Sequence, residues 1–298
     1  MKKGVIAVIG AGKWGQALHF ALNFKQECYI TSRTKRDLKN FVDLDFALDC
    51  EYLVIAIPAQ EIREWLKTNF TFKNQKILVA SKGIEASTGA FLNDIYALHV
   101  PNENIGFISG PSFAAEVIKG LPCALVINSI SKNIYKEFSK FFPNFIKTYY
   151  SLDVIGAEIA GAYKNVLAIA SGICEGLALG KNAQASLIAR GLVEMQRFGM
   201  HFGAKESSFL GLSGAGDLFL TANSTMSRNY RVGLGLAENK SLEDILKELG
   251  EVAEGVKTAF AIDKLSKEND IYVPIAHEVK LILEGKNPKD SLKDLLNK

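Results

Sequence analysis

Gly10-Ala11-Gly12-Lys13-Trp14-Gly15 follows directly on the apolar run Val5–Gly10, and this stretch decides the fold of the chain. In a dinucleotide-binding turn the first glycine makes the turn, the second lets the backbone approach a pyrophosphate, and the third lets the next helix pack on the strand. The apolar residues of Gln16–Phe24 are typical of a helix buried against a sheet. This context favours a dinucleotide site over an ordinary glycine turn, with contacts from Gly10, Gly12 and Gly15.

The residues after the second predicted strand indicate which dinucleotide binds. NAD-binding folds usually place an Asp or Glu about 20 residues past the glycines. Here the strand Cys28–Thr31 leads instead into Ser32-Arg33-Thr34-Lys35-Arg36. Cationic side chains suit a ribose 2′-phosphate. We therefore expect NADP(H) to be used at least as well as NAD(H), with Arg33 as the main contact. The alternative is a solvated basic loop.

Strand-like runs alternate with helical or loop segments in the first half of the chain. They are Val5–Gly10, Cys28–Thr31, Tyr52–Ile57, Ile77–Ala80, Ile105–Ser109 and Cys123–Ile127. Such alternation predicts an α/β fold with a parallel, doubly wound sheet. Beyond about residue 150 the helical period takes over and no strand pattern follows. We expect a Rossmann-type dinucleotide-binding domain at 1–150 and an all-helical substrate-binding and catalytic domain at 151–298.

Composition excludes several classes of protein. The chain has 298 residues, of which 48% are hydrophobic and 22% charged, as in an ordinary globular enzyme. The net charge of +3 and the lack of a long basic tract disfavour nucleic acid and membrane surfaces as partners. No apolar stretch reaches the roughly 18 uncharged residues of a membrane span. Lys2-Lys3 and the run after it superficially resemble a signal peptide, but Gly10, Gly12 and Lys13 interrupt it.

The cysteines predict neither a disulfide framework nor a metal site. Cys28, Cys50, Cys123 and Cys174 are widely spaced, without a C-x-x-C pair, and lie in apolar surroundings. This pattern is typical of reduced thiols in the core of a cytosolic protein. We therefore expect a cytoplasmic enzyme without a bound metal.

Lys164 is the one charged side chain in the apolar stretch Ile159–Cys174. Its neighbours one helical turn away supply no carboxylate. Desolvation weakens the hold of a lysine on its proton, which suits general acid–base chemistry. Asp217, after the glycines at 211, 214 and 216, is a candidate partner from elsewhere in the chain. The alternative is a lysine whose stem is buried while its head reaches solvent or a distant carboxylate.

Three further segments are candidates for holding an anionic substrate. Ser227-Arg228-Asn229 offers a hydroxyl, a guanidinium and an amide to a phosphate, although it is also compatible with a flexible loop and a solvated arginine. Lys82 follows a predicted strand, at the edge where open α/β sheets bind ligands. Gly110-Pro111-Ser112 follows another strand and opens a helix-like segment, where a simple helix cap is the alternative.

Together these segments resemble the bacterial NAD(P)-dependent glycerol-3-phosphate dehydrogenases. The resemblance runs through most of the chain, in family order. The motifs are Gly-Ala-Gly-Lys-Trp-Gly at 10–15, Ser-Lys-Gly-Ile-Glu at 81–85, Ser-Gly-Pro-Ser-Phe-Ala-Ala-Glu-Val at 109–117, Ala-Tyr-Lys-Asn-Val-Leu-Ala-Ile-Ala at 162–170, Gly-Ala-Gly-Asp-Leu at 214–218, Ser-Arg-Asn at 227–229 and Val-Ala-Glu-Gly-Val at 252–256. The resemblance implies a helical domain like the C-terminal domain of 6-phosphogluconate dehydrogenase.

The resemblance also implies roles for individual residues. Lys164 would be the catalytic acid–base group, with Lys82 and Asp217 completing the polar centre. Glycerol phosphate would be held by Lys82, Gly110, Ser112, Lys164, Asp217, Ser227, Arg228 and Asn229. The cofactor would further be contacted by Lys13, Trp14, Arg33, Lys82, Ala114, Arg228, Val252 and Glu254. The segment Ser32–Glu51 is shorter than is usual in the family, and this departure lies on the adenosine side of the cofactor.

The implied reaction is reduction of dihydroxyacetone phosphate to sn-glycerol 3-phosphate for glycerophospholipid synthesis, and a homodimer is compatible with this assignment. A second reading is a dehydrogenase of the same plan acting on a hydroxy acid or a ketopantoate-like substrate. Ser227-Arg228-Asn229 favours the phosphorylated substrate. A third reading, a non-catalytic NADP-binding sensor, has no need of a buried Lys164.

Overall fold

The computed structural model describes residues 1–250 and 252–296. The chain divides into two compact units, each described by itself: unit 1 comprises Met1–Lys82 and Leu92–Ala157, and unit 2 comprises Gly83–Phe91 and the chain from Glu158 onward. The sequence placed the division at residue 150. In the structure the last strand reaches Ser151 and unit 1 extends to Ala157, while Gly83–Phe91 groups with the helical unit.

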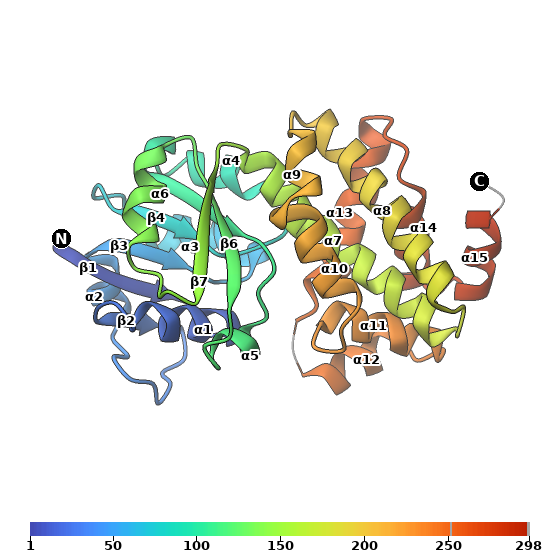
Figure 1. Cartoon of the computed structure of the whole chain (residues 1–298), viewed down its shortest axis with the longest axis horizontal. Helices are drawn as coiled ribbons and strands as arrows, with labels where there is room; N and C mark the ends of the chain where they lie inside the picture. The colour runs from blue at the N-terminus through green and yellow to red at the C-terminus, as the bar shows by residue number, and fades with distance from the viewer. Residues whose placement is uncertain (251, 297–298) are drawn as a thin grey trace. The chain divides into compact units, whose positions relative to one another are not determined.

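Unit 1 contains one seven-stranded sheet with strand order β2-β1-β3-β4-β5-β6-β7 (Figure 1). The strands are β1 (Lys2–Ile9), β2 (Cys28–Thr31), β3 (Cys50–Ile55), β4 (Lys76–Val79), β5 (Ile105–Ser109), β6 (Cys123–Asn128) and β7 (Ile146–Ser151). All six predicted strands are present. The expected all-parallel sheet is corrected at one place, because β6 runs antiparallel to β5 while every other pair is parallel.

Burial explains why six strands could be predicted and β7 was missed. The central strands are covered on both faces, so that Val8, Leu53 and Leu78 are each 0% exposed and the strands are continuous apolar runs. β7 lies at the edge of the sheet and pairs only with β6. Its sequence Ile-Lys-Thr-Tyr-Tyr-Ser mixes polar and aromatic residues, and Lys147 and Tyr149 are exposed.

The helices of unit 1 follow its strands. They are α1 (Lys13–Leu22), α2 (Leu44–Leu48), α3 (Ile62–Asn69), α4 (Leu92–Ala97), α5 (Ala114–Val117) and α6 (Lys132–Ser139), with short 3₁₀ turns at Ala59–Glu61 and Asn102–Asn104. Between β2 and β3 the chain makes a single bridge, Ile30 to Phe41, before the five-residue α2. The short connection thus adds no full strand outside β2.

The regular elements of unit 2 among the residues described are all helices, while its segment Gly83–Phe91 forms turns and irregular structure. Its elements are α7 (Val154–Gly176, which starts in unit 1), α8 (Lys181–His201), α9 (Glu206–Leu210), the π-helical turn η3 (Leu212–Gly216), α10 (Asp217–Ala222), α11 (Arg228–Ala237), α12 (Leu242–Leu249), α13 (Glu254–Glu268), α14 (Pro274–Leu283) and α15 (Pro288–Leu296). No described helix combines the length and the apolar character needed to cross a bilayer.

Glycines bring α7 and α11 into backbone contact. A Cβ at Gly172 would lie 2.1 Å from the carbonyl oxygen of Tyr230, and one at Gly233 would lie 2.1 Å from that of Ile169. Neither position therefore has room for a side chain. This close crossing fixes α11 against the helix that carries Lys164.

Gly233→Ala should destabilise the protein by about 1–3 kcal/mol, because the added methyl group meets rigid backbone and must push the helices apart. Gly235→Ala, on the same helix, is the matched control. Its Cβ would meet Cγ1 of the Ile245 side chain at 2.7 Å and no backbone atom, so we expect a smaller loss, which the higher helix propensity of alanine partly offsets. Thermal or urea unfolding measures both variants. Equal stabilities of the Gly233→Ala and Gly235→Ala variants would contradict a backbone contact at Gly233.

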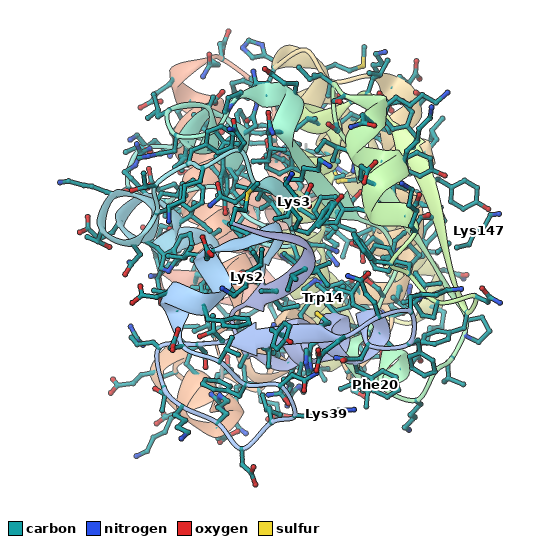
Figure 2. The ribbon with its side chains drawn as sticks, turned by 90° about the vertical axis from the view of Figure 1, so that its left-hand side faces the viewer. Lys2, Lys3, Trp14, Phe20, Lys39 and Lys147 are labelled. Atoms are coloured by element: carbon teal, nitrogen blue, oxygen red, sulfur yellow. The ribbon has the colours of Figure 1, made fainter. Side chains whose placement is uncertain are left out.

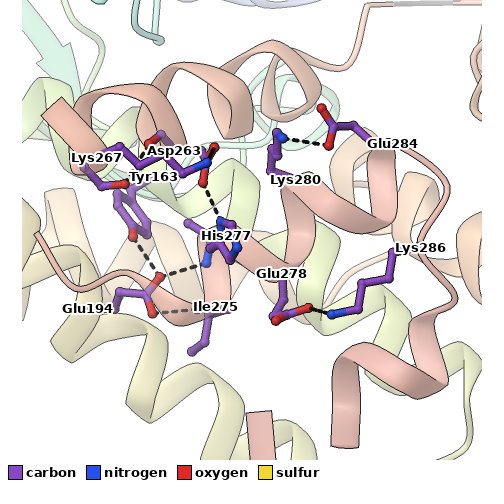
Figure 3. A network of polar contacts seen from close by, with 12 residues as sticks. Tyr163, Glu194, Asp263, Lys267, Ile275, His277, Glu278, Lys280, Glu284 and Lys286 are labelled. Carbon is purple, nitrogen blue, oxygen red and sulfur yellow. Dashed lines mark hydrogen bonds and ion pairs between the residues drawn. The ribbon is translucent and has the colours of Figure 1, made fainter. Parts of the chain in front are cut away.

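Glu194 joins three helices of unit 2 in a buried carboxylate network (Figure 3). It is 2% exposed and accepts hydrogen bonds of 2.8 Å from the Tyr163 hydroxyl and from the backbone N–H groups of Ile275 and Ala276. Burial raises the pKa of the Glu194 carboxyl, and these hydrogen bonds oppose the rise. The carboxylate thus caps the N-terminus of α14 and ties it to α7 and α8.

Candidate active site

The glycines of the first turn of unit 1 are required by close backbone contacts at two positions. Gly10 has φ +110°, and a Cβ there would lie 2.4 Å from the Ala56 carbonyl oxygen. A Cβ at Gly15 would lie 1.8 Å from the Gly10 carbonyl oxygen. These two glycines therefore let β1, α1 and the end of β3 pack together.

Gly12 is different, because a Cβ there would meet nothing within 4 Å. Its φ of −70° and ψ of 175° suit any residue, so the fold itself does not require glycine. Gly12 is also the N-cap of α1, with no side-chain cap and no acidic residue in the first turn. An uncapped helix N-terminus with open space beside its backbone fits a dinucleotide pyrophosphate.

Gly12→Ala should leave the melting temperature within about 1 °C of wild type and raise the Kd for NADPH about tenfold, because the methyl group occupies ligand space only. Gly15→Ala is the contrasting variant and should destabilise the fold. Fluorescence titration and thermal unfolding report the two effects. Unchanged NADPH binding by the Gly12 variant would contradict a pyrophosphate at this turn.

Trp14 follows in the first turn of α1 and packs against the apolar core of unit 1 (Figure 2). Its indole Nε1 is buried without a hydrogen-bond partner among the described residues.

The loop after β2 carries the candidate cationic contacts. Arg33, Lys35 and Arg36 are exposed, and the Ser32 hydroxyl donates to the Thr34 carbonyl oxygen at 2.7 Å. The loop after β2 therefore presents cations to solvent, close in sequence to the strand end.

Two further candidate segments follow neighbouring strands of the same sheet. Lys82 is half-buried and comes after β4, and Gly110 comes after β5, which pairs with β4 in parallel. Gly110 has φ +109°, and the Ser112 hydroxyl donates to its carbonyl oxygen at 3.2 Å. Ala114 begins α5. Because β1, β4 and β5 point the same way, these residues share one edge of the sheet with the glycine turn.

In unit 2, Lys164 forms a buried ion pair with Asp217. The Lys164 Nζ lies 2.6 Å from Asp217 Oδ1, and the two residues are 8% and 1% exposed. Lys164 Nζ also donates to the Thr221 hydroxyl at 3.0 Å, and that hydroxyl donates to the Asp217 carbonyl oxygen at 2.7 Å. The structure thus brings together the lysine and the aspartate that the sequence paired. The adjacent carboxylate supplies the opposite charge that a buried ammonium needs.

Sequence reasoning missed Thr221. It lies four residues after Asp217 on α10, and this spacing places both side chains on one face of a helix. Asp217 in turn begins α10 directly after the π-helical turn η3. A Cβ at Gly214 would lie 2.2 Å from the Phe209 carbonyl oxygen, so the glycine lets η3 pack on α9. The glycine-rich segment therefore sets where Asp217 enters the site.

The N-termini of α11 and α13 carry the remaining candidates of unit 2. Ser227 is the N-cap of α11 and accepts a hydrogen bond from the Tyr230 N–H, so this segment begins a helix and is not the flexible loop of the alternative. Arg228 is exposed at the first position of the helix, and Asn229 is buried. Glu254 begins α13, and Val252 is 56% exposed.

No group of three or more His, Cys, Asp or Glu side chains suited to a metal occurs among residues 1–250 and 252–296.

Comparison with known proteins identifies the family. The pattern described as NAD-dependent glycerol-3-phosphate dehydrogenase N-terminus matches residues 26–135, and its C-terminal counterpart matches residues 153–293. The chain belongs to the NAD-dependent glycerol-3-phosphate dehydrogenase family. A relative named glycerol-3-phosphate dehydrogenase [NAD(P)+] from Sulfurimonas denitrificans is 66% identical over 98% of this chain and 99% of its own length. One of the same name from Campylobacter lari is 61% identical over 98% and 97%.

A solved structure of this family supports the fold. The crystal structure of glycerol-3-phosphate dehydrogenase from Coxiella burnetii has a TM-score of 0.89 and 31% identity, and covers 98% of each chain. The Rossmann-type sheet followed by a helical C-terminal domain is therefore the architecture of this dehydrogenase family, as the sequence predicted.

Proposed function

We propose that the protein catalyses the NAD(P)H-dependent reduction of dihydroxyacetone phosphate to sn-glycerol 3-phosphate, and the reverse oxidation. The observation that carries this proposal is the buried Lys164–Asp217 ion pair, at 2.6 Å, in a chain of the glycerol-3-phosphate dehydrogenase family. A binding module without chemistry has no need of a buried ammonium held by a carboxylate and a hydroxyl. The alternative of a non-catalytic sensor is disfavoured for the same reason.

In this proposal the reaction needs a proton donor at the C2 oxygen of the substrate. A bound nicotinamide supplies the hydride that C2 receives. The Lys164 ammonium donates its proton to the C2 oxygen as the C=O bond becomes a C–O–H group, and it recovers that proton from solvent afterward. Asp217 and Thr221 hold the ammonium in place, so that no reorganisation is needed when negative charge develops on the oxygen.

The other roles follow the family motifs. Lys82 would place positive charge near the developing oxyanion and also contact the cofactor. Glycerol phosphate would be held by Gly110, Ser112, Ser227, Arg228 and Asn229. The cofactor would be held by Gly10, Gly12, Lys13, Trp14, Gly15, Arg33, Ala114, Arg228, Val252 and Glu254. The exposed guanidinium of Arg228, next to the capped N-terminus of α11, supports a phosphate contact there.

The proposed preference for NADP(H) rests on the cations after β2. Arg33→Ala should lower kcat/KM with NADPH about tenfold, because a charge-assisted hydrogen bond to the 2′-phosphate is lost. The constants with NADH, which lacks that phosphate, should change less than twofold and serve as the internal control. Equal losses with both cofactors, or no loss with either, would contradict the role of Arg33.

The direct test of the proposed function is NADPH consumption by the wild-type protein, followed by absorbance at 340 nm. Dihydroxyacetone phosphate should support turnover, and ketopantoate should not. Turnover with ketopantoate alone would favour the related hydroxy-acid enzymes of the same plan. NADPH binding without turnover of any substrate would favour a sensor. We further propose that the product serves glycerophospholipid synthesis in the cytoplasm, where the four free cysteines would stay reduced.

A further inference from the structure

A chain of buried hydrogen bonds connects three helices of unit 2. The Gly255 N–H donates to Asn229 Oδ1 at 3.0 Å, Asn229 Nδ2 donates to Asn165 Oδ1 at 2.9 Å, and Asn165 Nδ2 donates to the Gly161 carbonyl oxygen at 3.2 Å. Asn165 and Asn229 are 6% and 7% exposed. We call this chain, from Gly255 through Asn229 and Asn165 to Gly161, the amide relay.

Both carboxamides of the amide relay have a single satisfied orientation. At one end the backbone N–H of Gly255 can only donate, and at the other the carbonyl of Gly161 can only accept. A 180° flip of either side chain would place two donors or two acceptors against each other. Because unsatisfied buried polar groups are costly, the relay specifies how its three helices meet.

Each of three members of the relay is next in sequence to a residue of the proposed site. Asn165 follows Lys164 on α7, Asn229 follows Arg228 on α11, and Gly255 follows Glu254 at the start of α13. At Gly255, α13 lies so close to Asn229 and Asn165 that there is no room for a side chain. A Cβ at Gly255 would lie 2.7 Å from Asn229 Oδ1 and 2.8 Å from the Asn165 carbonyl oxygen.

We propose that Asn165 is a positioning residue for the reaction. Through the amide relay it holds the first turns of α11 and α13 against α7, so that Arg228 and Glu254 keep fixed places relative to Lys164. Asn229 then acts by orientation as well as by any contact with substrate, because each polar atom of its side chain already has a protein partner. This inference rests on the proposed function for the roles of Arg228 and Glu254.

The test compares Asn165→Leu with Tyr163→Phe. Leucine has nearly the shape of asparagine without its hydrogen bonds. Asn165→Leu removes two buried hydrogen bonds of α7. Tyr163→Phe is the control, because it removes a buried hydrogen bond of the same helix, to Glu194, at the other sequence neighbour of Lys164. Asn165→Leu should raise the KM for dihydroxyacetone phosphate and the Kd for NADPH about tenfold each. Tyr163→Phe should lower the melting temperature but leave both constants within about twofold.

Wild-type values of both constants in folded Asn165→Leu would overturn the proposal. If that variant does not fold, Gly255→Ala decides, since it removes no polar group and only forces the relay apart; unchanged constants there would also overturn it. In the double variant Asn165→Leu/Gly255→Ala, the KM and the Kd should rise by less than the product of the two single effects, because both substitutions break the same amide relay. Failure of the wild type to reduce dihydroxyacetone phosphate would refute the proposed function, while NADPH binding by the variants would still test the relay.

Discussion

Lys164→Met should lower kcat for dihydroxyacetone phosphate reduction by about 10²–10⁴-fold, because the reaction loses its positioned proton donor. Methionine keeps much of the volume of the lysine stem and cannot carry a proton. The Kd for NADPH should stay within a few-fold of wild type, because the proposed cofactor contacts lie elsewhere. Steady-state kinetics and fluorescence titration of the same preparation measure the two effects.

Lys181→Met is the matched control for this substitution. The Lys181 side chain is 76% exposed, although its Nζ lies at the same 2.6 Å from a carboxylate, that of Glu175. Its loss should leave kcat unchanged within about twofold, as expected for an exposed pair. If Lys164→Met retained near-normal turnover, another group would have to deliver the proton, and the assigned role would be wrong.

Asp217→Leu should destabilise the protein by about 3–5 kcal/mol, because it leaves the Lys164 ammonium buried without its carboxylate. The double variant Lys164→Met/Asp217→Leu should recover most of that loss, since it buries no unpaired charge. Urea unfolding of the wild type, both single variants and the double variant measures the coupling. Turnover should be low in all three variants.

The exposed Lys181–Glu175 ion pair is again the control for the buried Lys164–Asp217 pair. Glu175→Leu breaks an ion pair of equal length, between α7 and α8 at the surface, and should change stability by no more than about 1 kcal/mol. Equal effects at Asp217 and Glu175 would mean that burial does not set the energy of the Lys164 pair. Additive losses in the double variant would contradict a direct interaction.

The fold was predictable where the sequence of a single segment indicates how deeply that segment is buried or which turn it forms. Strand segments covered on both faces, such as Tyr52–Ile55 of β3, are continuous apolar runs, and the glycine turn after β1 has a fixed spacing. β7 was missed because an edge strand needs no such run. The direction of β6 was missed because strand direction depends on the connection between strands, which residue patterns do not specify.

The candidate site was predictable where one residue is anomalous by itself. Lys164 is conspicuous in an apolar helix, and Asp217 follows a cluster of glycines, so both could be found from the sequence. Thr221, Asn165 and Gly255 are ordinary residues in their own segments. Their importance arises from hydrogen bonds between helices, over sequence separations of 57 residues for the Lys164–Thr221 pair and 64 residues for the Asn165–Asn229 pair.

The central claim is that Lys164 delivers the proton to the C2 oxygen of the substrate. A crystal structure of the protein with NADP⁺ and sn-glycerol 3-phosphate tests it most directly. The account predicts a distance of about 2.6–3.2 Å between Lys164 Nζ and the C2 oxygen, with Asp217 still paired to the ammonium. A C2 oxygen bound to a different proton donor, with Lys164 Nζ out of hydrogen-bond reach, would contradict it.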